Sequence, residues 1–168
     1  MPSTYTLISS NVLTSTATSV TFSAIPSTYT DLVIRCSTRG STGTGAIRVT
    51  FNGDTATNYS DTALIGNGSA ASSSRDSSQN EGYAYNTNNF TTYTADTFSN
   101  SEFYIPNYLV SANKPFSTFG VQETNATAAG MAATALLWRN TAAITSVTLA
   151  ITTFAIGSSF YLYGISKS

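Results

Sequence analysis

Several residue types on which many enzymes depend are missing or scarce in this 168-residue sequence. It contains no histidine, which removes the usual general base near neutral pH and every Ser-His-Asp or Cys-His arrangement. The same absence removes a frequent zinc ligand, which the single cysteine cannot replace. We therefore expect no triad hydrolase, no metal centre and no cofactor.

Charge is scarce as well. Asp, Glu, Lys and Arg make up 9% of the sequence, against about 25% in ordinary soluble domains, and the net charge is −1. There is no basic patch for nucleic acid or anionic lipid, no secretory h-region, and no run of about 18 apolar residues that would predict a membrane span. We expect neither a nucleic acid nor a membrane as partner. The surface must be built from Ser, Thr and Asn, which permit close contact between neighbouring proteins.

The remaining reactive side chains are few and scattered. Cys36 is alone, so it forms no intrachain disulfide, and we predict a buried core residue rather than a reactive thiol. A glycosidase needs two carboxylates close together, and the region of Asp76, Glu81, Asp96 and Glu102 offers the best chance of such a pair. Solvated carboxylates in turns are the simpler interpretation. We predict that the chain is not an enzyme.

Apolar residues alternate with period two, the pattern of half-buried strands. In one segment Ile47, Val49 and Phe51 face one way, and Asn52-Gly53 follows with the pair of residues that suits a tight turn. Similar patterns predict strands over residues 4–9, 19–24, 31–37, 46–51, 58–65, 82–86, 101–105, 116–123, 132–139, 146–152 and 158–165.

Two segments are ambiguous. Residues 125–137 are rich in alanine and compatible with a short helix, but Gly130 interrupts them and no cap marks a helix start, so we favour a loop followed by a strand. Residues 66–80 are rich in Gly and Ser and have almost nothing to bury, which predicts a long surface loop. This loop is either a flexible connection or an arm that clasps a partner.

These patterns predict one domain over residues 1–168. We expect an all-β fold, a two-sheet antiparallel β-sandwich of about ten strands and of jelly-roll type. Leu32-Val33-Ile34 and the run from Phe160 to Tyr163 are apolar on both faces. We expect these strands to be covered twice, by the opposite sheet and by another subunit or element.

Aromatic side chains are the most suggestive functional feature. In polar surroundings they serve protein interfaces and sugar stacking equally well, and ordinary sheet packing is the third possibility. Trp138, which follows Leu136 and Leu137, is predicted to lie in the core or an interface rather than to form a sugar platform. The candidate interface residues are Tyr83, Tyr85, Tyr93, Tyr104, Tyr108, Phe160, Tyr161 and Tyr163.

Both ends of the sequence carry a family resemblance. Residues 5–8 (Tyr-Thr-Leu-Ile), 20–35 (from Val-Thr-Phe-Ser-Ala-Ile-Pro to Leu-Val-Ile-Arg) and 157–165 (Gly-Ser-Ser-Phe-Tyr-Leu-Tyr-Gly-Ile) resemble small virion structural proteins of tailed bacteriophages, especially those of aquatic and cyanobacterial hosts. The resemblance covers about a quarter of the chain. It implies a jelly-roll or β-sandwich module used as a capsid decoration (cement) protein, often trimeric, or as a tail or fibre component, and it implies no catalytic residues.

Taken together, these features predict a cement protein on the capsid exterior of a virion. It would be a homotrimer whose partners are its own copies and the major capsid protein. The alternative is a receptor-binding or carbohydrate-binding module of the tail or fibre.

Overall fold

The computed structural model describes residues 4–41, 45–125 and 129–166. In these ranges the chain forms strands and turns but no helix, and so no helix that could cross a membrane. The strands are β1 (Tyr5–Val12), β2 (Ala17–Phe22), β3 (Asp31–Ser37), β4 (Arg39–Gly40), β5 (Ile47–Phe51), β6 (Tyr59–Gly66), β7 (Ala71–Gln79), β8 (Gly82–Ala84), β9 (Asn89–Phe90), β10 (Asn100–Ile105), β11 (Lys114–Gln122), β12 (Gly130–Trp138), β13 (Val147–Phe154) and β14 (Ser159–Ile165).

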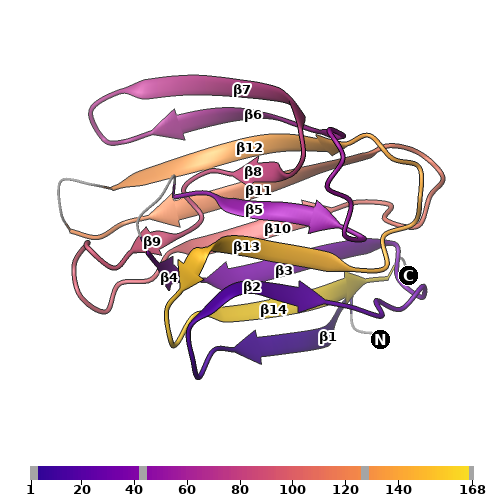
Figure 1. Cartoon of the computed structure of the whole chain (residues 1–168), viewed down its shortest axis with the longest axis horizontal. Helices are drawn as coiled ribbons and strands as arrows, with labels where there is room; N and C mark the ends of the chain where they lie inside the picture. The colour runs from indigo at the N-terminus through magenta and orange to yellow at the C-terminus, as the bar shows by residue number, and fades with distance from the viewer. Residues whose placement is uncertain (1–3, 42–44, 126–128, 167–168) are drawn as a thin grey trace.

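The strands form two stacked sheets (Figure 1). The large sheet has eight strands in the order β1-β14-β3-β10-β11-β12-β6-β7, and the small sheet has the order β8-β5-β13-β4-β9 with β2 also paired to β13. All described pairs are antiparallel except β4 with β9. Strands from the two ends pair in nested fashion, β1 with β14 and β2 with β13, which is typical of a jelly roll. The predicted two-sheet β-sandwich is confirmed.

The core lies between the sheets and is rich in aromatic rings. Phe51 of the small sheet packs edge-on against Phe116 of the large sheet, with ring centroids 5.0 Å apart, and lies 5.4 Å from Trp138. Tyr59 stacks beside Trp138 at 6.5 Å. Trp138 is fully buried, as predicted, and so is Cys36 with 3% exposure. Alternation in β5 places Ile47, Val49 and Phe51 between the sheets, whereas β11 turns Phe116 inward and Phe119 outward.

The Asn52-Gly53 turn forms as predicted. Both residues have positive φ, 54° and 68°, and the amide of Asp54 donates to the carbonyl of Phe51 at 2.9 Å. The turn does not join two adjacent strands, however. It leads the chain from β5 in the small sheet to β6 in the large one.

The number of strands differs from the prediction, with fourteen strands rather than about ten. The two-residue strands β4 and β9 are too short to leave a periodic pattern. Strand β7 occupies residues 71–79, where we predicted a loop, and extends the margin of the large sheet beyond the small one (Figure 1). The segment 125–137 does form a strand rather than a helix over its second part, although residues 126–128 lie outside the described ranges.

The double burial expected for β3 occurs within a single chain. Leu32, Val33 and Ile34 are all almost completely buried. On the outer side of the sheet, Val33 lies directly between Tyr104 of β10 and Tyr163 of β14, because these residues are paired across the strands. Neighbouring tyrosines supply the second cover without another subunit.

Candidate interaction surface

The outer face of the large sheet collects most of the exposed apolar side chains. Residues directly paired across an antiparallel sheet point the same way. One row runs from Leu7 through Tyr163, Val33, Tyr104, Ser117 and Ala135 to Thr62, and the next includes Arg35, Glu102, Phe119, Ala133 and Leu64.

Seven of the nine exposed large hydrophobic residues in the described ranges belong to this face by register. The seven are Tyr5, Leu7, Val12, Leu64, Tyr104, Phe119 and Met131, whereas Val110 and Ile156 lie outside the strands. Large apolar patches on a protein surface mark sites of interaction. This face is therefore the strongest candidate for a functional surface.

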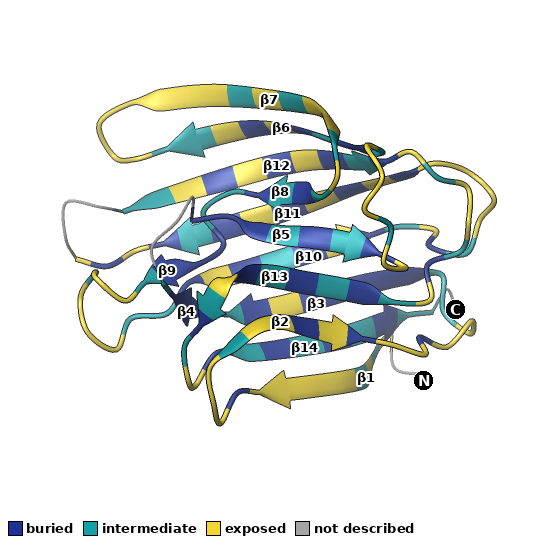
Figure 2. Ribbon diagram, viewed as in Figure 1, coloured by how far each residue is buried: buried dark blue, intermediate teal, exposed yellow. Residues whose placement is uncertain are grey.

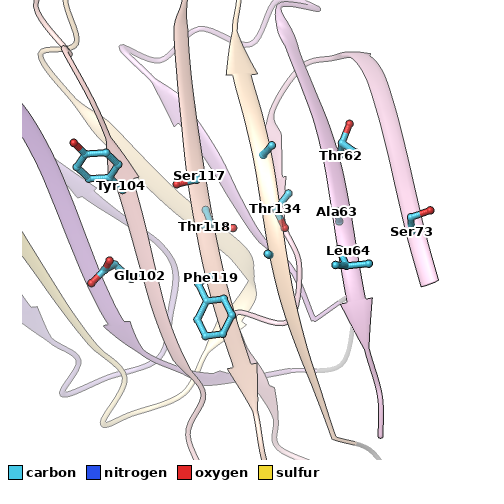
Figure 3. A pocket seen from close by; sticks show the side chains of 12 residues that line it. Thr62, Ala63, Leu64, Ser73, Glu102, Tyr104, Ser117, Thr118, Phe119 and Thr134 are labelled. Atoms are coloured by element: carbon cyan, nitrogen blue, oxygen red, sulfur yellow. The ribbon is translucent and has the colours of Figure 1, made fainter. Parts of the chain in front are cut away.

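The face is hollowed over β10, β11, β12 and β6. A hollow of about 530 Å³ lies there, and small residues such as Ala133 and Ala135 form its floor. Figure 3 shows Tyr104, Glu102 and Phe119 toward one side and Leu64 and Ser73 toward the other. A smaller apolar hollow of about 220 Å³ continues from Phe119 and Leu64 to Met131.

One end of this surface is polar. Arg35 and Glu102 form an exposed ion pair of 3.0 Å, and together with Asn100 and Phe119 they line a hollow of about 320 Å³. The Arg35 guanidinium also lies over the ring of Tyr5, 5.9 Å from its centroid. Because both charges are exposed, the pair adds little to stability. Of the described residues that line this hollow, Arg35 and Glu102 are the charged ones, and they neutralise each other.

Tyr104 is fixed in place by a carboxylate. Its hydroxyl donates to Oδ2 of Asp31 at 2.9 Å, and this hydrogen bond raises the pKa of Tyr104. The Oδ1 atom of Asp31 accepts from the backbone amide of Asn107 at 2.8 Å. The ring is thus held at the edge of the hollow while remaining 38% exposed.

The candidate interface residues predicted from the sequence do not lie together. Tyr104, Tyr161 and Tyr163 share the outer face of the large sheet. Tyr83 and Tyr85 belong to β8 and the residues after it, where their hydroxyls donate to Glu81 (3.2 Å) and Asp76 (3.1 Å).

The other three candidates are elsewhere. Tyr93 lies in a loop and packs edge-on against Phe90 at 5.0 Å. Tyr108 and Phe160 are fully buried, with Tyr108 donating to the carbonyl of Pro26 and Phe160 packing against Phe154 at 4.9 Å. These two have no exposed surface to offer a partner, because their side chains complete the core between the sheets.

Phe119, Leu64 and Met131 were missed as surface residues. All three belong to strands with apolar residues at alternate positions, and in each strand the inward side also carries hydrophobic residues. A signal was present, since β11 and β12 carry apolar residues on both of their faces. The sequence alone did not identify which face was inside.

The four carboxylates considered for a glycosidase pair have different partners and surroundings. Glu102 lies on the outer face beside Arg35, Glu81 pairs with Arg48 at 3.4 Å, and Asp96 is exposed in a loop. Asp76 lies opposite Asp61 in β6, a residue that the sequence did not single out. Within the described ranges, no group of three or more His, Cys, Asp or Glu side chains is placed to hold a metal ion.

Comparisons with family models, with curated proteins and with solved structures found no match to this chain.

Proposed function

We propose that this protein is a structural component of a tailed-bacteriophage virion, a capsid decoration protein that binds the assembled shell as a homotrimer and reinforces it. The observation that carries the proposal is the outer face of the large sheet. Among the residues that the structure describes, seven exposed large hydrophobic residues lie on this face. Its hollow is lined by described Ala, Ser, Thr, Leu, Phe and Tyr side chains, with Glu102 as the single charge.

Such a surface suits a protein partner. Burial of apolar area drives protein association, and aromatic residues and Met are enriched where interfaces are most buried. Tyr104, Phe119 and Met131 are of these types and keep 38%, 48% and 50% of their surface exposed. Because attachment would depend on apolar contact more than on charge, we expect it to be insensitive to salt.

Trimer formation would strengthen attachment. Three linked copies contact the shell with a high effective concentration, so weak individual contacts sum to stable binding. Anything that binds only the assembled shell stabilises it by mass action. The major capsid protein is therefore the proposed partner, and the capsid exterior the proposed location.

The test is to add purified protein to bare shells of the phage that encodes it. We expect saturable binding, an increase in the temperature at which the shells break, and a trimer mass in native mass spectrometry. The same binding should persist at about 1 M salt, where screening removes most surface electrostatics. If the shells gain no thermal resistance, the proposal is wrong.

The polar hollow favours one second candidate, a carbohydrate-binding or receptor-binding module of the tail. There the exposed ring of Phe119 lies beside Arg35, Glu102 and Asn100, which together provide an apolar platform and directional hydrogen-bonding groups. Binding of the purified protein to host polysaccharide, weakened by Glu102→Gln, together with no binding to shells would support this candidate over the first.

A further inference from the structure

Strands β6 and β7 form an arm at the margin of the large sheet. Within the described ranges, β7 is an edge strand that pairs with β6 alone, and none of its nine residues is buried. Figure 2 shows it largely exposed along its length. The attachment of β7 therefore depends on its backbone ladder with β6 and on a few side-chain contacts, and such elements open most readily in native proteins.

A buried carboxylate lies at the base of this arm. Asp61 of β6 is 3% exposed, and in the described part of the chain neither of its carboxylate oxygens has a hydrogen-bond partner of normal geometry. It is directly opposite Asp76 of β7 in the strand register. A buried charge without partners is costly, and like charges directly opposite each other destabilise a strand pair.

Among the described residues, no cation forms an ion pair with either of these two carboxylates. The groups near Asp61 from the other elements are Asp76 of β7, Tyr83 of β8 and Tyr85, with the Glu81–Arg48 pair beyond Tyr83. Arg48 is engaged by Glu81 at 3.4 Å. Arg75 is opposite Thr62 on the outer face, the other side of the sheet from Asp61. The hydroxyl of Tyr85 donates to Oδ2 of Asp76 at 3.1 Å. The backbone amide of Tyr83 lowers the pKa of Asp61, but this is the smallest of the three influences on that carboxylate.

The ladder is irregular at the same place. The register shifts between Tyr59 and Asp61: these two residues of β6 are two positions apart, whereas their partners in β7 are three positions apart. Within this irregular part of β7, Ser78 has a positive φ of 56°. A bulge leaves one residue unpaired and weakens the ladder locally. Repulsion between Asp61 and Asp76 therefore acts where β7 is held least firmly.

We propose that Asp61 and Asp76 make the β6–β7 arm a pH-dependent element, in which β7 stays paired while Asp61 is protonated and detaches more readily once both carboxylates are charged. Burial, with the Asp76 charge as a second cause, raises the pKa of Asp61 from 3.8 to about 6. Because the pKa is higher in the closed arm, closure is most favoured below about pH 4, weakens as pH rises to about 6, and changes little above that. This inference concerns the fold alone and does not depend on the proposed function.

The experiment is amide hydrogen exchange of the purified protein between pH 4 and pH 8, corrected for the intrinsic rate at each pH. The β7 amides are compared with those of β3 and β13 in the same molecule. A pKa difference of about two units corresponds to about 100-fold. We expect β7 protection to fall by up to this factor between pH 4 and pH 7 relative to the two central strands.

Asp61→Asn should remove this pH dependence and raise β7 protection at pH 7. Asp96→Asn is the matched control, since it makes the same change at an exposed loop position and should keep the wild-type profile. A β7 profile that is unchanged in Asp61→Asn would overturn the proposal. Carboxyl ¹³C NMR of the wild-type protein gives an independent answer: we expect Asp61 to titrate near pH 6, and a midpoint below about 4.5 would be equally decisive against the proposal.

Discussion

The indole nitrogen of Trp138 donates a hydrogen bond of 2.8 Å to the carboxylate of Asp54. This bond ties β12 of the large sheet to the turn that leaves β5 of the small sheet. The same carboxylate accepts from the side chain of Asn58 and the backbone amide of Ala56, both at 2.9 Å. These bonds, with that of Asn58 the largest cause, lower the pKa of Asp54 to about 2.

Replacing this carboxylate should weaken the fold. In Asp54→Asn, an NH2 group replaces one of the carboxylate oxygens that accept these hydrogen bonds, so a donor faces a donor. We therefore expect a loss of about 1–2 kcal/mol in the free energy of unfolding at pH 7, measured by urea denaturation. Because the pKa is lowered in the folded state, this contribution is complete above about pH 4 and is lost as pH falls toward 2. The variant and wild type should therefore converge in acid. Asp96→Asn is the control, and an equal loss there would remove the special role of Asp54.

Gly120 allows the chain after β8 to pass close to β11. A Cβ at this position would lie 2.5 Å from the carbonyl oxygen of Asn86 and 2.7 Å from that of Tyr85, and backbone atoms cannot move aside cheaply. Gly120→Ala should cost about 3 kcal/mol of stability. At Gly66 the added Cβ meets only Met131 at 3.8 Å, so Gly66→Ala should change stability by less than about 1 kcal/mol. Thermal unfolding of both variants tests this difference. Equal melting temperatures for Gly120→Ala and Gly66→Ala would contradict the prediction.

The thiol of Cys36 should be inert in the folded protein. It is 3% exposed, and burial raises its pKa far above the usual range, so thiolate is not available to react. We expect no labelling by a thiol reagent at pH 8 over hours and complete labelling in guanidinium chloride. Rapid labelling of the native protein would mean that β3 opens far more readily than its burial indicates.

Sequence patterns predicted the strands that have one apolar side. In β5, Ile47, Val49 and Phe51 define an inner face so clearly that both the strand and the turn at Asn52-Gly53 follow from local physics. Such strands carry their own signal because burial acts on every second residue. Strand β3 was predicted from its continuous apolar run instead, and its bounds, residues 31–37, are found as predicted.

Features that depend on distant parts of the chain were not predictable. Strand β7 has no apolar side, and only pairing with β6 makes it a strand. The hollow of the outer face brings together Leu64, Tyr104 and Phe119 from three strands whose order in the sheet does not follow their order in the sequence. Tyr108 was assigned to an interface because its polar neighbours suggested a surface, whereas the fold places its ring in the core.

The central claim is that the outer face of the large sheet attaches the protein to its assembly. The most direct measurement is binding of purified variants to bare shells. Phe119→Ser combined with Leu64→Ser removes two exposed apolar side chains from the hollow, and Val110→Ser combined with Ile156→Ser removes two that lie elsewhere. We predict at least a tenfold loss of affinity, about 1.4 kcal/mol, for the first pair and no loss for the second, with both variants folded. Equal affinities for the two pairs would contradict the claim.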